Sequence, residues 1–128
     1  MFMYGPLRFY AQEMVKNIGE RGKEILSLMY PPVTMYENGG EIIIEADIPG
    51  FDKKEIKVRL EKDAVIITAS REKVDNGTII LDQRPDKVNK RIRLPYEVDQ
   101  GSDMTAKYLN GVLTLRIPAK GLKSIKVE

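Results

Sequence analysis

The side chains that could carry out catalysis in this 128-residue chain are few. Its serines are Ser27, Ser70, Ser102 and Ser124. A serine hydroxyl needs a neighbouring base to become a nucleophile, and the sequence contains neither histidine nor cysteine. The same absence removes the usual ligands of zinc and copper. We therefore expect no catalytic residues, no metal site and no cofactor, and we expect that the protein is not an enzyme.

The densest cluster of positive charge comprises Arg84, Lys87, Lys90, Arg91 and Arg93. Basic stripes attract nucleic acids, but a single-stranded site also needs aromatic side chains for stacking, and none interleaves with this run. The net charge of +2 is small as well. We interpret the run as a solvated strand face or a set of ion pairs and expect no nucleic-acid partner. A small β-domain nucleic-acid-binding protein remains an alternative function.

The first element that must position any functional surface is a helix over residues 7–30. Apolar residues recur there at roughly helical spacing, and charged residues fill most of the other face. Gly19 and Gly22 each weaken such a helix by about 1 kcal/mol relative to alanine. Pro31-Pro32 ends it. The pattern predicts a helical N-terminal arm over residues 1–32.

From Val33 onward the apolar residues follow a period of two, which is typical of strands. Turn residues separate the segments, and Asn110-Gly111 is a strong hairpin signal. About eight short strands with no βαβ pattern predict an all-β fold, an antiparallel immunoglobulin-like β-sandwich over residues 33–119. The expected strands are 33–36, 41–48, 55–60, 64–69, 78–81, 87–94, 104–108 and 112–117.

Residues 120–128 form a short extended tail that carries several charges and places Ile125 and Val127 near its end. Chain ends usually fray into water, where two bulky apolar side chains are unfavourable. The pair makes physical sense where a surface captures it. The tail therefore indicates assembly rather than catalysis.

Three motifs, in this order along the chain, resemble the small heat-shock proteins, which are built on the α-crystallin domain. Residues 46–51, Ala-Asp-Ile-Pro-Gly-Phe, resemble the family's acidic-apolar-Pro-Gly turn. Residues 106–118 are similar to its A-x-x-x-N-G-V-L motif with the following strand, and Ile125-Lys126-Val127 resembles its C-terminal I-x-I/V motif. The length suggests a prokaryotic or archaeal member. Val88 and Lys90 depart from the Phe and Arg that many members have there.

The resemblance implies an ATP-independent chaperone, a holdase that binds unfolding client proteins and prevents their aggregation under heat stress. It also implies a dimer that assembles into a large homo-oligomer. In that dimer a strand containing Thr78, Ile79, Ile80 and Leu81 is exchanged onto the partner's strand containing Val33 and Met35. Clients would bind the apolar residues of the N-terminal arm, namely Phe2, Met3, Tyr4, Leu7, Phe9, Tyr10, Met14 and Ile18.

The resemblance also assigns a place to the tail. Ile125 and Val127 would dock into a groove of another dimer, between strands 55–60 and 104–109. The groove would be lined by Ile56, Val58, Leu60, Met104 and Ala106.

The compartment follows from what the sequence lacks. It has no basic start followed by an apolar signal segment, and no apolar run near the ~18 residues that a membrane-spanning helix needs. The absence of cysteine fits a reducing compartment. We expect a cytoplasmic protein without a membrane partner. The alternative is a membrane-surface protein anchored by the N-terminal helix.

Overall fold

The structure is a computed structural model that describes residues 29–73, 76–101 and 103–119. The helix expected in the N-terminal arm, the client-binding residues expected between Phe2 and Ile18, and the tail pair Ile125 and Val127 lie outside the described residues.

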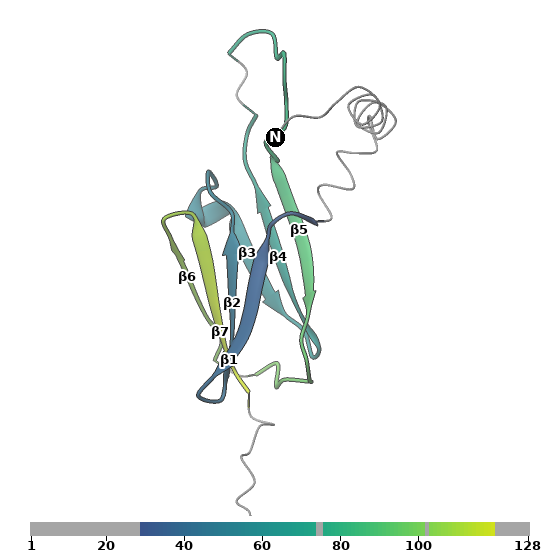
Figure 1. Ribbon diagram of the computed structural model, residues 1–128, viewed down its shortest axis with the longest axis vertical. Helices are drawn as coiled ribbons and strands as arrows, with labels where there is room; N and C mark the ends of the chain where they lie inside the picture. The colour runs from purple at the N-terminus through teal and green to yellow at the C-terminus, as the bar shows by residue number, and fades with distance from the viewer. Residues whose placement is uncertain (1–28, 74–75, 102, 120–128) are drawn as a thin grey trace, which may run out of the picture.

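Seven strands form two antiparallel sheets in the described part of the chain (Figure 1). One sheet has the order β1-β2-β7-β6, and the other has the order β3-β4-β5. A short 3-10 turn, η1 (Lys53–Glu55), precedes β3. The predicted all-β antiparallel sandwich is confirmed. The strands are β1 (Val33–Asn38), β2 (Glu41–Asp47), β3 (Ile56–Leu60), β4 (Ala64–Ser70), β5 (Lys87–Arg93), β6 (Thr105–Leu109) and β7 (Val112–Pro118).

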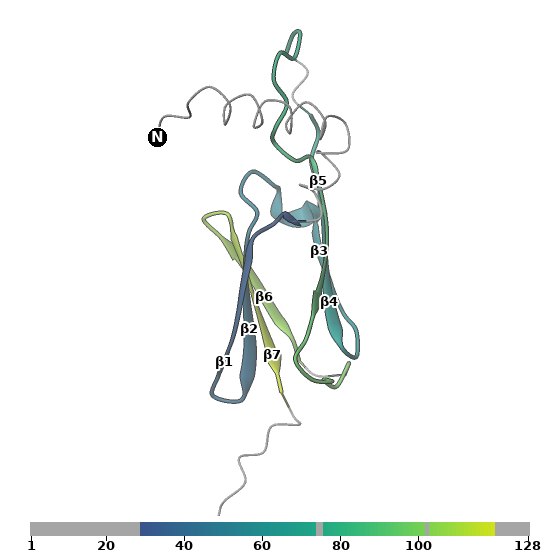
Figure 2. The ribbon, with the colours of Figure 1, turned by 45° about the vertical axis from the view of Figure 1, so that its right-hand side comes forward.

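The core lies between the two sheets, which Figure 2 shows as two separate layers. Side chains alternate along a strand, so every second residue of each strand faces the opposite sheet. Ile44, Ile67 and Leu115 are completely buried there. Each apolar side chain buried in this way contributes about 1.5–3 kcal/mol, which makes this layer the main source of stability.

Ile43 departs from the simple alternation. It points to the outer face of its sheet, yet only 2% of it is exposed. In the strand register it lies between Tyr36 of β1 and Arg116 of β7. Long side chains on neighbouring strands can cover a central position in this way.

The strand expected over Thr78–Leu81 is absent from the single chain, so this part of the sequence prediction is wrong for an isolated copy. Residues 76–86 contain no strand, and the segment extends beyond the end of the sandwich (Figure 1). Among the described strands, none pairs with this apolar run. Without a partner strand, the backbone groups of this segment bond to water instead of to a neighbouring strand, and its apolar side chains have no sheet face to pack on.

Candidate docking surfaces

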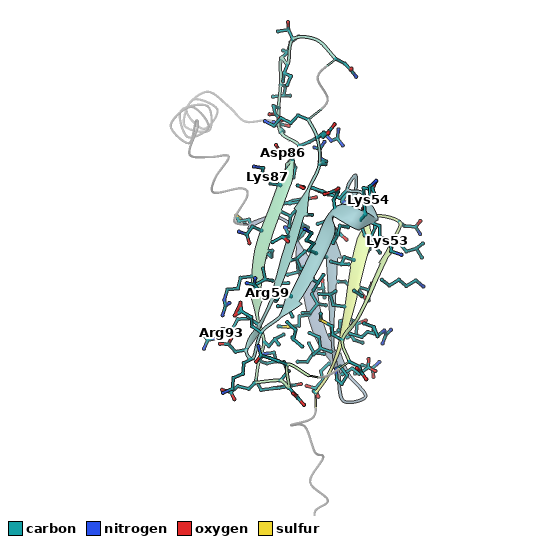
Figure 3. The ribbon with its side chains drawn as sticks, turned by 180° about the vertical axis from the view of Figure 1, so that it is seen from behind. Lys53, Lys54, Arg59, Asp86, Lys87 and Arg93 are labelled. Carbon is teal, nitrogen blue, oxygen red and sulfur yellow. The ribbon has the colours of Figure 1, made fainter. Side chains whose placement is uncertain are left out.

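The edge strands β3 and β6 lie on the same side of the sandwich. The connection from β2 to β3 passes against the β6–β7 hairpin, where the Ile48 amide donates to the Gly111 carbonyl at 2.8 Å. The Tyr108 hydroxyl of β6 donates to the Ile48 carbonyl, also at 2.8 Å. β3 therefore starts beside β6, and Figure 3 shows it next to the β6–β7 hairpin. Each of these strands is hydrogen-bonded to one neighbour and presents a free edge.

A strip of half-buried apolar side chains follows these two edges, where the resemblance predicts a groove, and we call this strip the groove. Ile56, Val58 and Leu60 alternate along β3, face the core and remain partly exposed. Met104 and Tyr108 face them from the β6 side and are also partly exposed. Apolar side chains that pack on a core while still contacting water gain free energy from a further apolar contact. The structure thus brings together Ile56, Val58, Leu60 and Met104 of the predicted groove lining.

Ala106 and Tyr108 complete the groove in different ways. Ala106 lies on β6 between Met104 and Tyr108 and is exposed. Tyr108 was not among the predicted lining residues. The signal for it was present, because residues 104, 106 and 108 share one face of a strand. Its bond to Ile48 also fixes the ring in place.

The second candidate surface is the free edge of β1. β1 pairs with β2 alone, so its other edge has unpaired backbone groups. Met35 and Tyr36 on this strand are 39% and 41% exposed, whereas Val33 packs partly on the core. An open edge with exposed apolar side chains is suited to pairing with an added strand.

The segment that would supply such a strand is apolar and exposed. Ile79, Ile80 and Leu81 are 55%, 97% and 73% exposed. Three successive bulky apolar residues in water are unfavourable for a soluble single copy. The resemblance pairs the β1 edge with this segment between two copies, and neither is paired with a strand among the residues that the structure describes.

Hydrogen bonds hold the end of the segment next to β5, although the apolar run at residues 79–81 pairs with no described strand. The Arg71 amide donates to the Asp86 carbonyl, and the Arg71 Nε donates to the Pro85 carbonyl, each at 2.9 Å. The Arg71 guanidinium also lies 5.8 Å from the centroid of the Phe51 ring, within reach of a cation–π contact. Lys73 Nζ lies 3.3 Å from an Asp82 carboxylate oxygen. These contacts direct the segment away from the sandwich.

The basic run of β5 is used at least partly for ion pairs within the sheet. Arg91 pairs with Glu61 at 3.1 Å and with Asp63 at 3.4 Å, both from the β3–β4 turn. This supports the interpretation of the run as a charged strand face with ion pairs. On the outer face of β3-β4-β5, no aromatic side chain lies among the strand residues that the structure describes. A base-stacking platform is therefore missing from this face.

On the opposite side of the sandwich, a contact joins the two sheets. The Tyr96 hydroxyl, just after β5, donates to a Glu37 carboxylate oxygen of β1 at 3.3 Å. Desolvation raises the pKa of Tyr96, and the neighbouring Glu37 charge raises that pKa further. Burial likewise raises the pKa of Tyr30. Both phenols therefore keep their proton to a higher pH than an ordinary tyrosine does.

Metal-binding clusters and membrane-spanning helices were the other kinds of site to consider among the described residues. Within residues 29–73, 76–101 and 103–119, His, Cys, Asp and Glu side chains form no group of three that could hold a metal ion. The same part of the chain contains no helix with the length and apolar character needed to cross a membrane. A hollow of about 580 Å³ on the outer face of the four-stranded sheet has mixed walls, including Tyr36, Glu45, Lys107 and Arg116.

Comparison with known proteins identifies relatives over most of the chain. The sequence profile of the Hsp20/alpha crystallin family matches residues 34–128. A probable 15 kDa heat shock protein of Leptospira interrogans is 31% identical over 111 residues, which cover 85% of each chain. The 18.6 kDa class III heat shock protein of Oryza sativa subsp. japonica is 33% identical over 115 residues, covering 75% of this chain and 66% of the rice protein, just under two thirds of its length.

A solved structure extends the likeness to the fold. The crystal structure of a mutant of hsp14.1 from Sulfolobus solfatataricus P2 has a TM-score of 0.78 and 42% sequence identity. The match covers 98% of this chain and 100% of that chain. A second mutant of the same protein gives a TM-score of 0.74 and 45% identity over 84% of this chain and 93% of that chain.

Proposed function

Because this chain belongs to the Hsp20/alpha crystallin family, the small heat-shock proteins, we propose that it is an ATP-independent chaperone of the holdase type. It binds unfolding proteins in the cytoplasm, prevents their aggregation and releases them without chemistry. The proposal is a binding role rather than an enzymatic one. The observation that carries it is the half-exposed apolar groove between β3 and β6, since a monomer gains nothing from keeping Val58 and Leu60 partly in water.

The proposed occupant of the groove is the C-terminal tail of another copy. Ile125 and Val127 are spaced two residues apart, which places both on one face of an extended segment. Each contributes about 1.5–3 kcal/mol when buried, so one tail contributes roughly 3–6 kcal/mol before the cost of ordering it. A single contact of this size is weak. Several tails in one closed assembly become strong together through their high effective concentration.

The same assembly rests on a proposed dimer. Ile79, Ile80 and Leu81 of one copy pair with the free β1 edge of the other, next to Met35. That exchange covers the most exposed apolar run of the described chain and satisfies the edge of β1 at once. The N-terminal arm, with Phe2, Phe9 and the other apolar residues of its first eighteen positions, is the proposed client-binding surface. Its methionines suit irregular partners.

The function is tested by heating a labile model enzyme with and without the protein, in the absence of nucleotide. The proposal predicts that turbidity falls in proportion to added protein and reaches its minimum near a stoichiometric ratio. Addition of ATP should change nothing. Aggregation at an unaltered rate with the protein in excess would contradict the holdase role.

The tail contact has its own test. The double variant Ile125→Ser with Val127→Ser should reduce the particle mass to that of a dimer, because both docked side chains lose their apolar contact. Gly121→Ser, in the same tail, is the matched control and should leave the mass unchanged. Light scattering coupled to size-exclusion chromatography measures both. An equally large particle for the double variant would rule out tail docking.

A further inference from the structure

The strands that line the groove carry positive charge and no carboxylate. β3 contributes Lys57 and Arg59, and β6 contributes Lys107. All three are exposed and belong to the strand positions that alternate with the groove floor. Lys57 and Lys107 have no carboxylate partner among the described residues. Arg59 lies 3.4 Å from Glu61, but Glu61 also pairs with Arg91 at 3.1 Å, so its charge is shared.

The acidic side chains lie at the ends of the groove rather than along it. Asp52 and Glu55 precede β3, Glu61 follows it, and Asp103 precedes β6. Lys53 and Lys54 lie at the same end as Asp52, whose carboxylate is 3.8 Å from Lys54 Nζ. Figure 3 shows Lys53 and Lys54 beside the β6–β7 hairpin and Arg59 farther along β3. Within β3 and β6 themselves, every charged side chain is therefore a cation.

The proposed occupant has the same sign of charge. Between residues 120 and 127 the tail contains Lys120, Lys123 and Lys126, and its first carboxylate is Glu128. If Ile125 and Val127 face the groove floor, alternation places Lys126 between them on the outer side. Lys57 and Lys107 belong to the edge strands on the two sides of the groove. Charges of the same sign repel each other across such an edge, most strongly at low ionic strength, and this repulsion weakens binding.

We infer that the β3–β6 groove binds an extended apolar segment that carries carboxylates more tightly than it binds the chain's own lysine-rich tail. An exposed client segment of the pattern apolar-acidic-apolar is then its preferred partner and displaces the tail. The inference rests on the proposed docking of the tail in this groove. As a consequence, the positive charges of the tail oppose its binding to strands that are themselves positively charged. Added salt should strengthen the tail contact by screening the repulsion.

The test uses two fluorescent peptides and the full-length chain. One peptide has the sequence of residues 119–128, and the other carries Lys123→Glu and Lys126→Glu. The host is the chain with Ile125→Ser and Val127→Ser, whose own tail no longer competes. At low ionic strength the acidic peptide should bind about 10-fold or more tightly than the native-sequence peptide. The ratio should fall to less than about 2-fold near 0.5 M salt.

Charge reversal on the groove locates the effect. In the same host, Lys57→Glu with Lys107→Glu should reverse the preference, so that the native-sequence peptide binds more tightly. The matched control is Lys87→Glu with Arg93→Glu on β5, which changes the net charge equally at the opposite edge. That control should retain the preference for the acidic peptide. Circular dichroism of each variant verifies that the sandwich is intact.

The possible results separate this inference from the proposed function. Equal binding of both peptides, or tighter binding of the native-sequence peptide, would overturn the inference and leave tail docking in place. Loss of the preference in the β5 control would also overturn it, because net charge would then be the cause. If neither peptide binds, tail docking and the inference fail together. In the chain that retains Ile125 and Val127, Lys126→Glu should keep the assembly intact at a lower protein concentration than the wild type requires. An assembly that dissociates more readily than the wild type would contradict the inference.

Discussion

Gly111 is the residue at which the β6–β7 hairpin contacts the connection from β2 to β3. Its backbone has a φ of +78°, and a Cβ placed there would lie 2.9 Å from the Pro49 Cβ and 3.1 Å from the Pro49 Cα. A side chain would therefore meet both backbone strain and a steric clash. The Asn-Gly pair was identifiable from sequence as a hairpin turn. The close approach of Pro49 was not, because it depends on how the β2–β3 connection crosses the hairpin.

Gly111→Ala should lower the free energy of unfolding by about 2 kcal/mol or more, since both penalties act on the folded state. Gly40→Ala is the matched control. Gly40 also has a positive φ, of +80°, but nothing lies within 4 Å of a Cβ placed there. Urea titration of the two variants measures the difference. A cost for Gly111→Ala that does not exceed that of the control would show that the Pro49 contact is unimportant.

Tyr96 should make the free energy of unfolding depend on pH in the alkaline range. Its pKa is raised above 10.0 in the folded chain by desolvation and by Glu37. A raised pKa means that the folded state favours the protonated phenol, so the contribution is complete below pH 10 and is lost as pH rises through the raised value. The stability difference between the wild type and Tyr96→Phe should therefore be constant well below pH 10.0 and should decrease as the pH rises above 10.0. A difference that stays constant over this range would contradict the role of the Glu37 contact.

At the scale of the elements, alternation alone was enough to predict the strands of the sandwich and most of the groove floor. Ile56, Val58 and Leu60 could be found this way because their period of two is uninterrupted. Tyr108 was missed although it shares that pattern, and the burial of Ile43 depends on side chains from two other strands. The failure at residues 78–81 has a clear cause. A strand is a property of a pair, and the sequence does not say which chain supplies the partner.

The exchanged strand predicts an effect on the dimer alone. Ile80→Asp should weaken dimerisation at least about 100-fold, because the proposed exchange would bury the side chain in both copies of a symmetric pair and each loss is about 1.5–3 kcal/mol. Folding of the single sandwich should be unaffected, since Ile80 is 97% exposed in it. Gln83→Glu adds the same charge to the same segment and serves as the control. Analytical ultracentrifugation over a dilution series distinguishes the two, and an unchanged dimer for Ile80→Asp would refute the exchange.

Across the whole molecule, the described surface presents several unpaired strand edges. β1 and β3 each leave one edge free, β6 does the same beside the groove, and the apolar run at residues 79–81 has no cover. Exposed ion pairs such as Lys62–Glu97 at 3.5 Å add little to stability in water. Assembly is the change that would cover most of this apolar surface. The sequence indicated assembly through Ile125 and Val127, but the charge mismatch at the groove became apparent only with β3 and β6 side by side.

The mass of the native particle as a function of temperature and concentration tests the central claim most directly, namely that weak apolar contacts shared between copies create the function. One copy has a mass of 14.6 kDa. The account predicts a particle many times larger at moderate temperature, which releases smaller species on heating and reassembles on cooling. It also predicts dimers near twice the single-copy mass for the Ile125→Ser, Val127→Ser variant. A wild-type protein that remains a 14.6 kDa monomer at every temperature and concentration would contradict it.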